Sequence, residues 1–312
     1  MKTPKTIAPG EWACLPSLEI ARSHPSVASC NGKIYAFGGG GPSFKSLNSV
    51  ICYDPEKGKW SNCQPMPTHR SGTVAATVEN KIYIIGGGFR QEDGMFRFLT
   101  KVEIYHPESD SWEKGPDLLK PHDYPAVAKL DNSIYVIGGH HPDATKGGPK
   151  TDPGFDFCER LDLKKAAWEE ITPLPTPRFA LSATTRDNKI LAMGGVAFRP
   201  EGFNNFTTIE IYDPSTGLWT SEEKFCLPWP AAGLGSAVLG EDLYIFGGYS
   251  DDDIHNRAAR YDSEENAWQQ IAKLPSPVAA MGVTTCKGAI YTVGGWADDG
   301  RTPIDAFYRY KP

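Results

Sequence analysis

The sequence predicts an all-β protein built from six repeats, each of four short antiparallel strands. The first observation is a glycine pair that recurs six times along the 312 residues, beginning at Gly38, Gly86, Gly138, Gly194, Gly247 and Gly294. Each pair directly follows a short run of aliphatic, β-branched and aromatic residues, which is typical of a buried strand. The spacings of 48, 52, 56, 53 and 47 residues indicate one structural unit per repeat.

Each unit is predicted to contain strands A, B, C and D in chain order. Strand A is a run of small apolar residues, and strand B leads into the glycine pair, where the absence of a Cβ permits positive φ and close backbone approach. In most repeats strand C carries a tyrosine and strand D a tryptophan seven residues later, as in Tyr105 and Trp112. These large apolar rings with one polar tip are suited to packing between neighbouring sheets.

This pattern resembles the kelch repeat over nearly the whole chain. The resemblance implies a six-bladed β-propeller with one four-stranded antiparallel blade per repeat. The sixth repeat has an aromatic strand C near Phe307 to Tyr310 and no tryptophan after it, whereas Trp12 precedes the first glycine pair in the phase of a D strand. We therefore expect the segment near Glu11 to Leu15 to close the last blade as its outer strand, and residues 1–312 to form a single kelch domain.

Composition excludes several classes of protein. The net charge of −6 disfavours a nucleic-acid partner. Seven scattered cysteines without a Cys-x-x-Cys pair favour a reducing compartment, so a cytoplasmic location is expected. Neither a signal peptide nor a membrane span is predicted, because no sufficiently long apolar run occurs. The oligomeric state is not determined by the sequence.

Basic side chains recur 16 residues before the glycine pair. This position holds Arg22, Arg70, His122 and Arg178 in the first four repeats. One interpretation is that they brace neighbouring loops through backbone carbonyls. The other is that they surround a central funnel and trap an anion, because a guanidinium group binds carboxylate or phosphate bidentately. Kelch domains of ubiquitin-ligase adaptors hold acidic peptides with a similar ring of arginines, so the resemblance implies an acidic partner.

The loops between D and the next A strand and those between B and C share one face in such a propeller. The B–C loops vary most in length, which is typical of binding surfaces. Candidate ligand-binding residues of this face, besides the three arginines, are His24, Arg90, Phe179, Arg199, Trp229, Tyr249, Trp296 and Arg301. Trp229 lies in a stiff Pro-Trp-Pro segment, which would hold the ring at little entropic cost.

The triplet His122-Asp123-Tyr124 is the candidate for proton chemistry. A histidine titrates near neutral pH, and the two neighbours could orient it or share its proton. Adjacent residues of an extended chain point to opposite sides, which argues against all three facing one ligand. The iron-binding run Glu-x3-Asp-x3-His of nitrile-specifier proteins, another kelch group, is matched only by Asp251 and His255, because Gly247 stands at its first position. We therefore expect no metal and no other cofactor.

Two functions remain open from the sequence. The first is a binding propeller that recognises an acidic peptide, a protein loop or another anionic group at the arginine-rich face. The second is a cofactor-independent enzyme, an isomerase of the mutarotase type or a lyase, acting on a small anionic or polyhydroxy molecule in the central funnel. A closed pocket would favour the enzyme, and an open face would favour a peptide partner.

Overall fold

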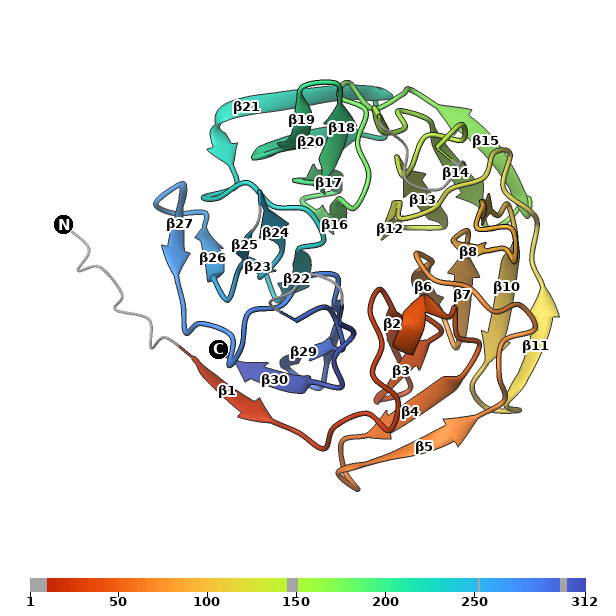
Figure 1. Cartoon of the computed structure of the whole chain (residues 1–312). Helices are drawn as coiled ribbons and strands as arrows, with labels where there is room; N and C mark the ends of the chain where they lie inside the picture. The colour runs from red at the N-terminus through yellow and green to blue at the C-terminus, as the bar shows by residue number, and fades with distance from the viewer. Residues whose placement is uncertain (1–9, 145–150, 252, 298–301) are drawn as a thin grey trace.

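The computed structural model describes residues 10–144, 151–251, 253–297 and 302–312. In this part of the chain, six four-stranded antiparallel sheets succeed one another along the sequence. Figure 1 shows them arranged as a ring around a central axis, with strand A of each sheet innermost and strand D outermost. The predicted six-bladed β-propeller is confirmed.

The first three blades follow the repeats in order. Blade 1 consists of β2 (Ser26–Cys30), β3 (Lys33–Phe37), β4 (Val50–Asp54) and β5 (Lys59–Cys63). Blade 2 consists of β6 (Val74–Val78), β7 (Lys81–Ile85), β10 (Val102–His106) and β11 (Ser111–Lys114). Blade 3 consists of β12 (Ala126–Leu130), β13 (Ser133–Ile137), β14 (Cys158–Asp162) and β15 (Ala167–Ile171).

The last three blades repeat the arrangement. Blade 4 consists of β16 (Ser182–Arg186), β17 (Lys189–Met193), β20 (Thr208–Asp213) and β21 (Leu218–Cys226). Blade 5 consists of β22 (Gly235–Leu239), β23 (Asp242–Phe246), β26 (Ala258–Asp262) and β27 (Ala267–Gln270). Blade 6 consists of β28 (Gly282–Cys286), β29 (Ala289–Val293), β30 (Phe307–Lys311) and β1 (Glu11–Cys14).

The B–C loops carry additional short elements. Blades 2, 4 and 5 have hairpins there, formed by β8 (Gly88–Arg90) with β9 (Phe96–Phe98), β18 (Val196–Arg199) with β19 (Gly202–Asn205), and β24 (Tyr249–Ser250) with β25 (Asp253–Ile254). Blade 1 has the 3-10 helix η1 (Pro42–Phe44). Within the described residues, no helix has the length and apolar character needed to cross a membrane.

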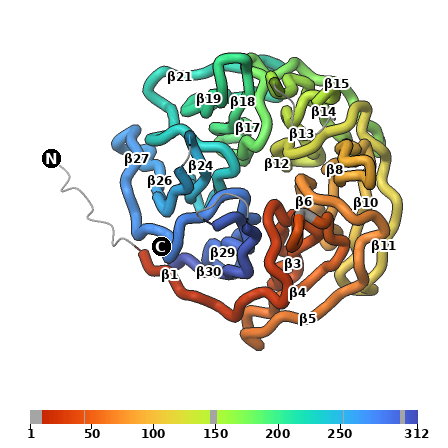
Figure 2. The backbone as a smooth tube through the Cα atoms, in the orientation of Figure 1, coloured from red at the N-terminus to blue at the C-terminus, as the bar shows by residue number. Residues whose placement is uncertain are grey.

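The N-terminal strand closes the ring. Strand β1 pairs antiparallel with β30, and Trp12 stands opposite Tyr310 in the register. In Figure 2 the red β1 segment runs along the blue β30, which places the N-terminal strand beside the C-terminal one. The predicted closure by the segment near Glu11 to Leu15 is confirmed, and it removes the open edge that blade 6 would otherwise present.

The strand D tryptophans connect neighbouring blades. Each indole N–H donates to a backbone carbonyl at the end of the outer strand of the preceding blade or just after it, and the rings pack between blades as expected. The six pairs are Trp60 with Pro16, Trp112 with Gln64, Trp168 with Pro116, Trp219 with Thr172, Trp268 with Cys226, and Trp12 with Ala272. Apolar burial and one satisfied polar tip therefore join every blade to its neighbour.

Candidate functional site

The D–A and B–C loops meet on one face of the ring. Isolated antiparallel bridges join the end of a D–A loop to the start of the following B–C loop in five blades: Ser23 to Gly40, Ser71 to Gly88, Phe179 to Val196, Ala232 to Tyr249, and Ala279 to Trp296. In blade 3 the backbone N–H of His140 donates to the carbonyl of Asp123 at 2.8 Å. The two sets of loops therefore form one continuous surface around the central opening.

The recurrent basic side chains lie inside the blades. Arg22, Arg70 and Arg178 are at most 1% exposed, and His122 is fully buried. Each side chain bonds the carbonyl of the first glycine in the diglycine of its own repeat, 16 residues later. The contacts are Arg22 to Gly38 (3.1 Å), Arg70 to Gly86 (2.8 Å), His122 to Gly138 (2.6 Å) and Arg178 to Gly194 (2.9 Å). These groups satisfy carbonyls that the diglycine turn leaves without a strand partner.

At three of these four positions, a glutamate carboxylate contacts the basic side chain. Arg70 contacts Glu103 at 2.9 Å, His122 contacts Glu159 at 3.1 Å, and Arg178 contacts Glu210 at 2.9 Å. The three glutamates occupy the same register position of strand C, opposite the residue two before the glycine pair. In blade 1 that position holds Ile51, and Arg22 donates instead to the Ser49 hydroxyl.

The expectation of an anion trap at these arginines is therefore corrected. Their guanidinium groups are directed into the blades, and both terminal nitrogens of each donate to backbone carbonyls or side chains of the same blade. Burial lowers the pKa of Arg22 to about 10, and burial also lowers the pKa of Arg178 despite the charge of Glu210. The bracing interpretation describes the observed contacts.

Trp229 takes over the same structural role in blade 5. The position of the arginine is occupied there by Ala231, which has no side-chain donor. The indole N–H of Trp229 donates to the carbonyl of Gly247 at 3.2 Å, and the side chain is only 4% exposed. A tryptophan two positions before the usual brace thus replaces the missing donor, and the expectation that Trp229 contacts a ligand is corrected.

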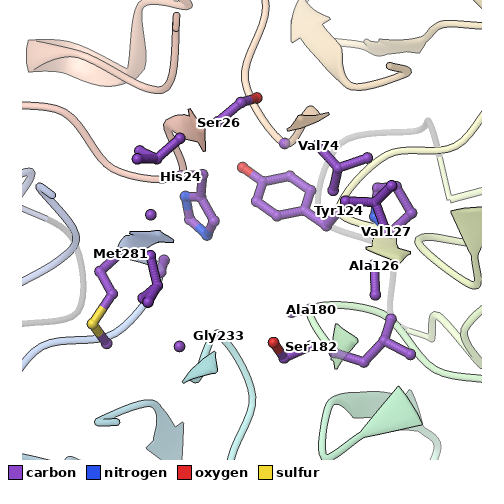
Figure 3. A pocket seen from close by; sticks show the side chains of 18 of the residues that line it. His24, Ser26, Val74, Tyr124, Ala126, Val127, Ala180, Ser182, Gly233 and Met281 are labelled. Atoms are coloured by element: carbon purple, nitrogen blue, oxygen red, sulfur yellow. The ribbon is translucent and has the colours of Figure 1, made fainter. Parts of the chain in front are cut away.

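The triplet His122-Asp123-Tyr124 does not converge on one point. His122 is directed into blade 3, where both ring nitrogens face acceptors on Gly138 and Glu159. Tyr124 has a left-handed backbone, with φ of 53°, and its side chain enters the central opening (Figure 3). The prediction of joint proton chemistry by the three residues is therefore corrected, because the backbone directs the outer two side chains to different surroundings.

Left-handed backbone recurs at the start of each inner strand. The equivalent residues and their φ values are His24 (49°), Gly72 (64°), Tyr124 (53°), Ala180 (51°), Gly233 (58°) and Ala280 (55°). Glycine occupies two of these positions, as expected for a conformation in which a Cβ is strained, and alanine, with the smallest side chain after glycine, occupies two more. His24 and Tyr124 are the exceptions, and their rings lie edge to face with centroids 4.3 Å apart across the opening (Figure 3).

A chain of ring contacts continues from this pair along the rim. Successive centroids are 4.0 Å apart for Phe179 and His140, 5.2 Å for His140 and Tyr124, 4.5 Å for His24 and Trp296, and 6.4 Å for Trp296 and Tyr249. These rings come from the loops of blades 1, 3, 4, 5 and 6. We call the six residues Phe179, His140, Tyr124, His24, Trp296 and Tyr249 the aromatic mouth.

Two carboxyl groups accompany the aromatic mouth. Oδ2 of Asp152 lies 2.5 Å from Nδ1 of His140, and Oδ1 of Asp152 accepts the backbone N–H groups of His141 and Gly154. Although burial acts in the opposite direction, these hydrogen bonds lower the pKa of Asp152. Asp123 is 3% exposed, and its Oδ1 has no hydrogen-bond partner among the described residues. Burial, followed by the charge of Asp152, raises the pKa of Asp123 well above its usual range.

The imidazole of His24 is held neutral. Burial, followed by the charge of His140, lowers the pKa of His24 to about 3. Burial likewise raises the pKa of Tyr124 and brings that of Tyr249 to about 12. The rings of His24, Tyr124 and Tyr249 are therefore uncharged at neutral pH.

A central channel lies inside the ring of A strands, with a volume of about 250 Å³. His24 and Tyr124 line it, and the other residues that line it are mainly small and apolar. Its hydroxyl groups bond one another, as between Ser182 and Ser236 at 2.7 Å and between Ser26 and Thr73. No lysine, arginine, aspartate or glutamate belongs to this lining, which consists of described residues throughout.

The remaining predicted site residues have different surroundings. Tyr249 and Trp296 are half-buried in the aromatic mouth, and Phe179 is buried beneath His140. Arg90 and Arg199 are exposed on the hairpins of blades 2 and 4. Arg301 lies outside the described residues.

Sequence reasoning did not assign His140 and Asp152 to the site. His140 directly follows the glycine pair, at the position that Tyr249 and Trp296 hold in blades 5 and 6. Asp152 lies 12 residues later in the longest B–C loop, where the repeat has no equivalent position. The signal that would have found them is the proximity of His140 to Gly139, because the residue after a glycine pair begins the loop face.

The sequence and the fold of this chain are both similar to those of known proteins. The chain matches the KLHDC2/KLHL20/DRC7 Kelch-repeats domain over residues 12–195 and again over residues 124–312. Among solved structures it is similar to that of YjhT, with a TM-score of 0.78 and 14% sequence identity over 95% of this chain and 96% of the other. At that identity the similarity concerns the fold.

Curated relatives show the same repeat. Kelch-like protein terF of Aspergillus terreus is 24% identical over 100% of this chain and 70% of its own length. Kelch-like protein 36 of Mus musculus is 29% identical over 88% of this chain, and Beta-scruin of Limulus polyphemus is 27% identical over 87%. The chain spans only 44% and 30% of the length of these last two proteins. With two matches that together extend from Trp12 to the last residue, the chain belongs to the kelch-repeat family.

Proposed function

We propose that this chain is a binding module that holds a peptide or protein loop on its D–A/B–C face, with the aromatic mouth at the centre of the contact. The observation that carries the proposal is the mouth itself, in which rings from five blades meet around one opening. Clustered aromatic side chains near the centre of a surface are the residues that dominate binding energy in protein interfaces. A protein-binding role is also consistent with membership of the kelch family.

Two structural features suit this role. The loops are variable in length while the blades beneath them are rigidly hydrogen-bonded, an arrangement that positions contact residues precisely enough for recognition. Large side chains are retained at the left-handed positions of His24 and Tyr124, where glycine would be less strained. Strain of this kind is retained where a side chain is needed at that place.

An acidic partner was expected from the sequence. The three arginines that motivated this expectation are enclosed within the blades. Among the described candidate residues, the exposed Arg90 and Arg199 remain to attract an acidic ligand. They lie on the hairpins of blades 2 and 4, outside the aromatic mouth. Their role is thus at the periphery of the contact, where charges affect the rate of association more than affinity.

The alternative of an isomerase or lyase receives less support from the geometry. Catalysis in the central channel would depend on His24 and Tyr124, the titratable residues of its lining. The pKa of His24 is lowered by burial to about 3 and that of Tyr124 is raised by burial, so the first is a weak base and the second a weak acid at neutral pH. An anionic substrate would also meet no basic counter-charge among the lining residues.

The experiment is a selection from a random peptide library displayed on phage against the purified full chain. We expect the selected peptides to lose at least about tenfold in affinity on Trp296→Ala and Tyr249→Ala, as is usual for central aromatic contacts. Leu218→Ala is the matched control, because Leu218 is exposed at the start of β21, beyond the C–D turn on the opposite face. Failure to select any peptide, or equal binding to the mouth variants, would contradict the proposal.

The cytoplasmic location stays a prediction. The seven cysteines are all free thiols in the structure, which agrees with the reducing compartment inferred from their spacing. Subcellular fractionation of the tagged chain from its source cells tests this point separately from binding.

A further inference from the structure

An unpaired carboxyl oxygen lies beside the aromatic mouth. A Cβ placed on Gly72 would stand 2.5 Å from Oδ1 of Asp123 and 2.8 Å from Cδ2 of Tyr124. A Cβ on Gly88 would stand 3.2 Å from the same oxygen. The carboxyl oxygen and the Tyr124 ring therefore pack against glycine backbone, at a place where a side chain would clash with them.

This oxygen is an exception to the rule for buried polar atoms. Most such atoms have a hydrogen-bond partner, and one without a partner costs free energy in the unliganded fold. Asp123 is 3% exposed and its Oδ1 has no partner among the described residues. An acceptor in that situation is complementary to an N–H donor supplied by a ligand.

A second polar atom without a partner belongs to the mouth itself. Nε1 of Trp296 is buried and makes no hydrogen bond within the described part of the chain. In contrast, the indole N–H groups of the six strand D tryptophans and of Trp229 all donate to carbonyls. Trp296 can therefore donate to a carbonyl oxygen of a bound chain.

The carboxyl groups beside the mouth belong to two aspartates. Asp123 and Asp152 are the carboxyl groups that accompany it, and the latter is hydrogen-bonded to His140. Within the described residues, no lysine or arginine side chain has an ion pair, side-chain hydrogen bond or cation–π contact with the six mouth residues or with Asp123. The faces of the Tyr124, Tyr249 and Trp296 rings carry the negative part of the aromatic quadrupole, which attracts cations.

We infer that the aromatic mouth holds a positively charged side chain, the ammonium group of a lysine or the guanidinium group of an arginine, presented by the bound peptide or protein loop. The cationic head donates to Oδ1 of Asp123 and lies against the aromatic rings, and the backbone carbonyl of the same residue accepts the indole N–H of Trp296. This inference rests on the proposed function and specifies the central residue of the partner.

The test uses four capped, fluorescein-labelled pentapeptides with arginine, lysine, leucine or glutamate between glycines, titrated against the full chain by fluorescence anisotropy. We expect the arginine and lysine peptides to bind at least about tenfold more tightly than the leucine and glutamate peptides, the ratio that cation–π and charge-assisted contacts together provide. Asp123→Asn replaces the carboxyl group, which can ionise beside a bound cation, with an amide of nearly the same shape and should reduce this preference to about twofold or less.

Asp143→Asn is the matched control. Asp143 lies in the B–C loop of blade 3, and its side chain is 93% exposed, so its substitution should leave the preference unchanged. Trp296→Leu provides a second variant on a different loop, and it should weaken binding of the arginine and lysine peptides by about tenfold. Thermal melting of each variant establishes that it is folded before binding is compared.

The possible outcomes separate the inference from the proposed function. Tighter binding of the glutamate peptide, equal binding of all four peptides, or an unchanged preference in folded Asp123→Asn would overturn the cation inference. Absence of binding by any pentapeptide would also overturn it. In each case the peptide-library selection decides independently whether the face is a binding surface.

Discussion

The indole N–H of Trp12 donates to the backbone carbonyl of Ala272 at 2.8 Å, joining two residues that are 260 positions apart in the chain. The ring also packs edge to face on Phe246, with centroids 5.5 Å apart. One side chain from the N-terminal strand thus ties blade 6 to blade 5.

Removing this strand should strongly destabilise the propeller. Deletion of residues 1–16 eliminates β1, leaves β30 as an open edge and uncovers the apolar surface under Trp12. We expect the melting temperature, measured by circular dichroism, to fall by roughly 10 °C or more, because burial of a tryptophan-sized side chain and four residues of strand pairing are lost. A truncated chain that melts within a degree or two of the intact one would show that the ring does not depend on this closure.

The buried pair of Arg70 and Glu103 should be far more important for stability than an exposed pair in the same blade. Glu103→Gln leaves a guanidinium group without its counter-charge in the interior, and we expect a loss of about 3–5 kcal/mol in the free energy of unfolding. Glu113→Gln is the matched control, because Lys81 and Glu113 are 43% and 46% exposed and such pairs contribute at most about 1 kcal/mol. Chemical denaturation of both variants provides the comparison.

The arginine braces give a related expectation. Simultaneous replacement of Arg22, Arg70 and Arg178 by alanine should prevent folding, since three sets of diglycine carbonyls lose their donors. If this triple variant instead melts like the wild type while losing its ligand, the three residues bind ligand after all. Circular dichroism and the peptide titration separate these results.

Trp229 should affect stability without affecting recognition. Trp229→Phe retains most of the apolar ring and removes the N–H that reaches the carbonyl of Gly247. We expect a loss of about 1 kcal/mol in the free energy of unfolding, the net value of one hydrogen bond in the interior. Binding of selected peptides should be unchanged, and weakened binding by a folded variant would return Trp229 to the functional surface.

Stability should fall in mild acid partly through His24. Its pKa is about 6.5 in the unfolded chain and about 3 in the fold, so below pH 6.5 the unfolded chain takes up a proton that the folded chain does not. The stability that neutral His24 contributes is thus present above pH 6.5 and is lost as the pH falls toward 3, by at most about 1.4 kcal/mol per pH unit. His24→Asn, which tolerates the left-handed backbone, should show a smaller decrease between pH 7 and pH 4.5 in urea denaturation. Parallel curves for the two proteins would mean that His24 does not titrate in this way.

Asp123 should show the opposite sign. Its pKa is raised in the fold, so its linkage contribution is favourable at low pH and is lost as the pH rises above the unfolded value of about 3.8. Asp123→Asn should therefore increase the free energy of unfolding at pH 7, by about 1–3 kcal/mol for an unpaired buried group, and the gain should vanish near pH 3.8. Stabilisation together with loss of the preference for cationic peptides is the combination expected of a binding residue kept at a cost to the fold. Destabilisation at pH 7 would assign Asp123 a structural role.

Much of the architecture follows from the order of residues because the repeat is local. The glycine pairs, the aliphatic runs before them and the spaced Tyr and Trp define each blade within about 50 residues, and short-range strand pairing needs nothing further. Even the long-range closure by Trp12 was predictable, since a strand D is missing at one end of the pattern and present at the other. The tryptophans also had one role in every repeat, to pack between blades.

The candidate site depended on the tertiary structure. The sequence placed basic side chains at one repeat position but did not show their direction, and only the packed blade brings Arg70 to Glu103 and to the carbonyl of Gly86. The role of Trp229 also required the structure, because its indole N–H reaches the diglycine carbonyl of blade 5 from a different repeat position than the arginines use. Residue type and spacing therefore determined the blades, whereas side-chain direction determined which groups the blades enclose.

The sequence by itself determined six four-stranded units, their order and the strand that closes the ring. The hydrophobic pattern, the glycine pairs and the tryptophan spacing that define these features recur at fixed positions in each repeat. The tertiary structure decided which side chains meet at the centre. His24, Tyr124, His140 and Trp296 come from three different blades and approach one another only when the ring is closed. The contacts between their half-buried rings set the character of the opening and are a property of that assembled surface.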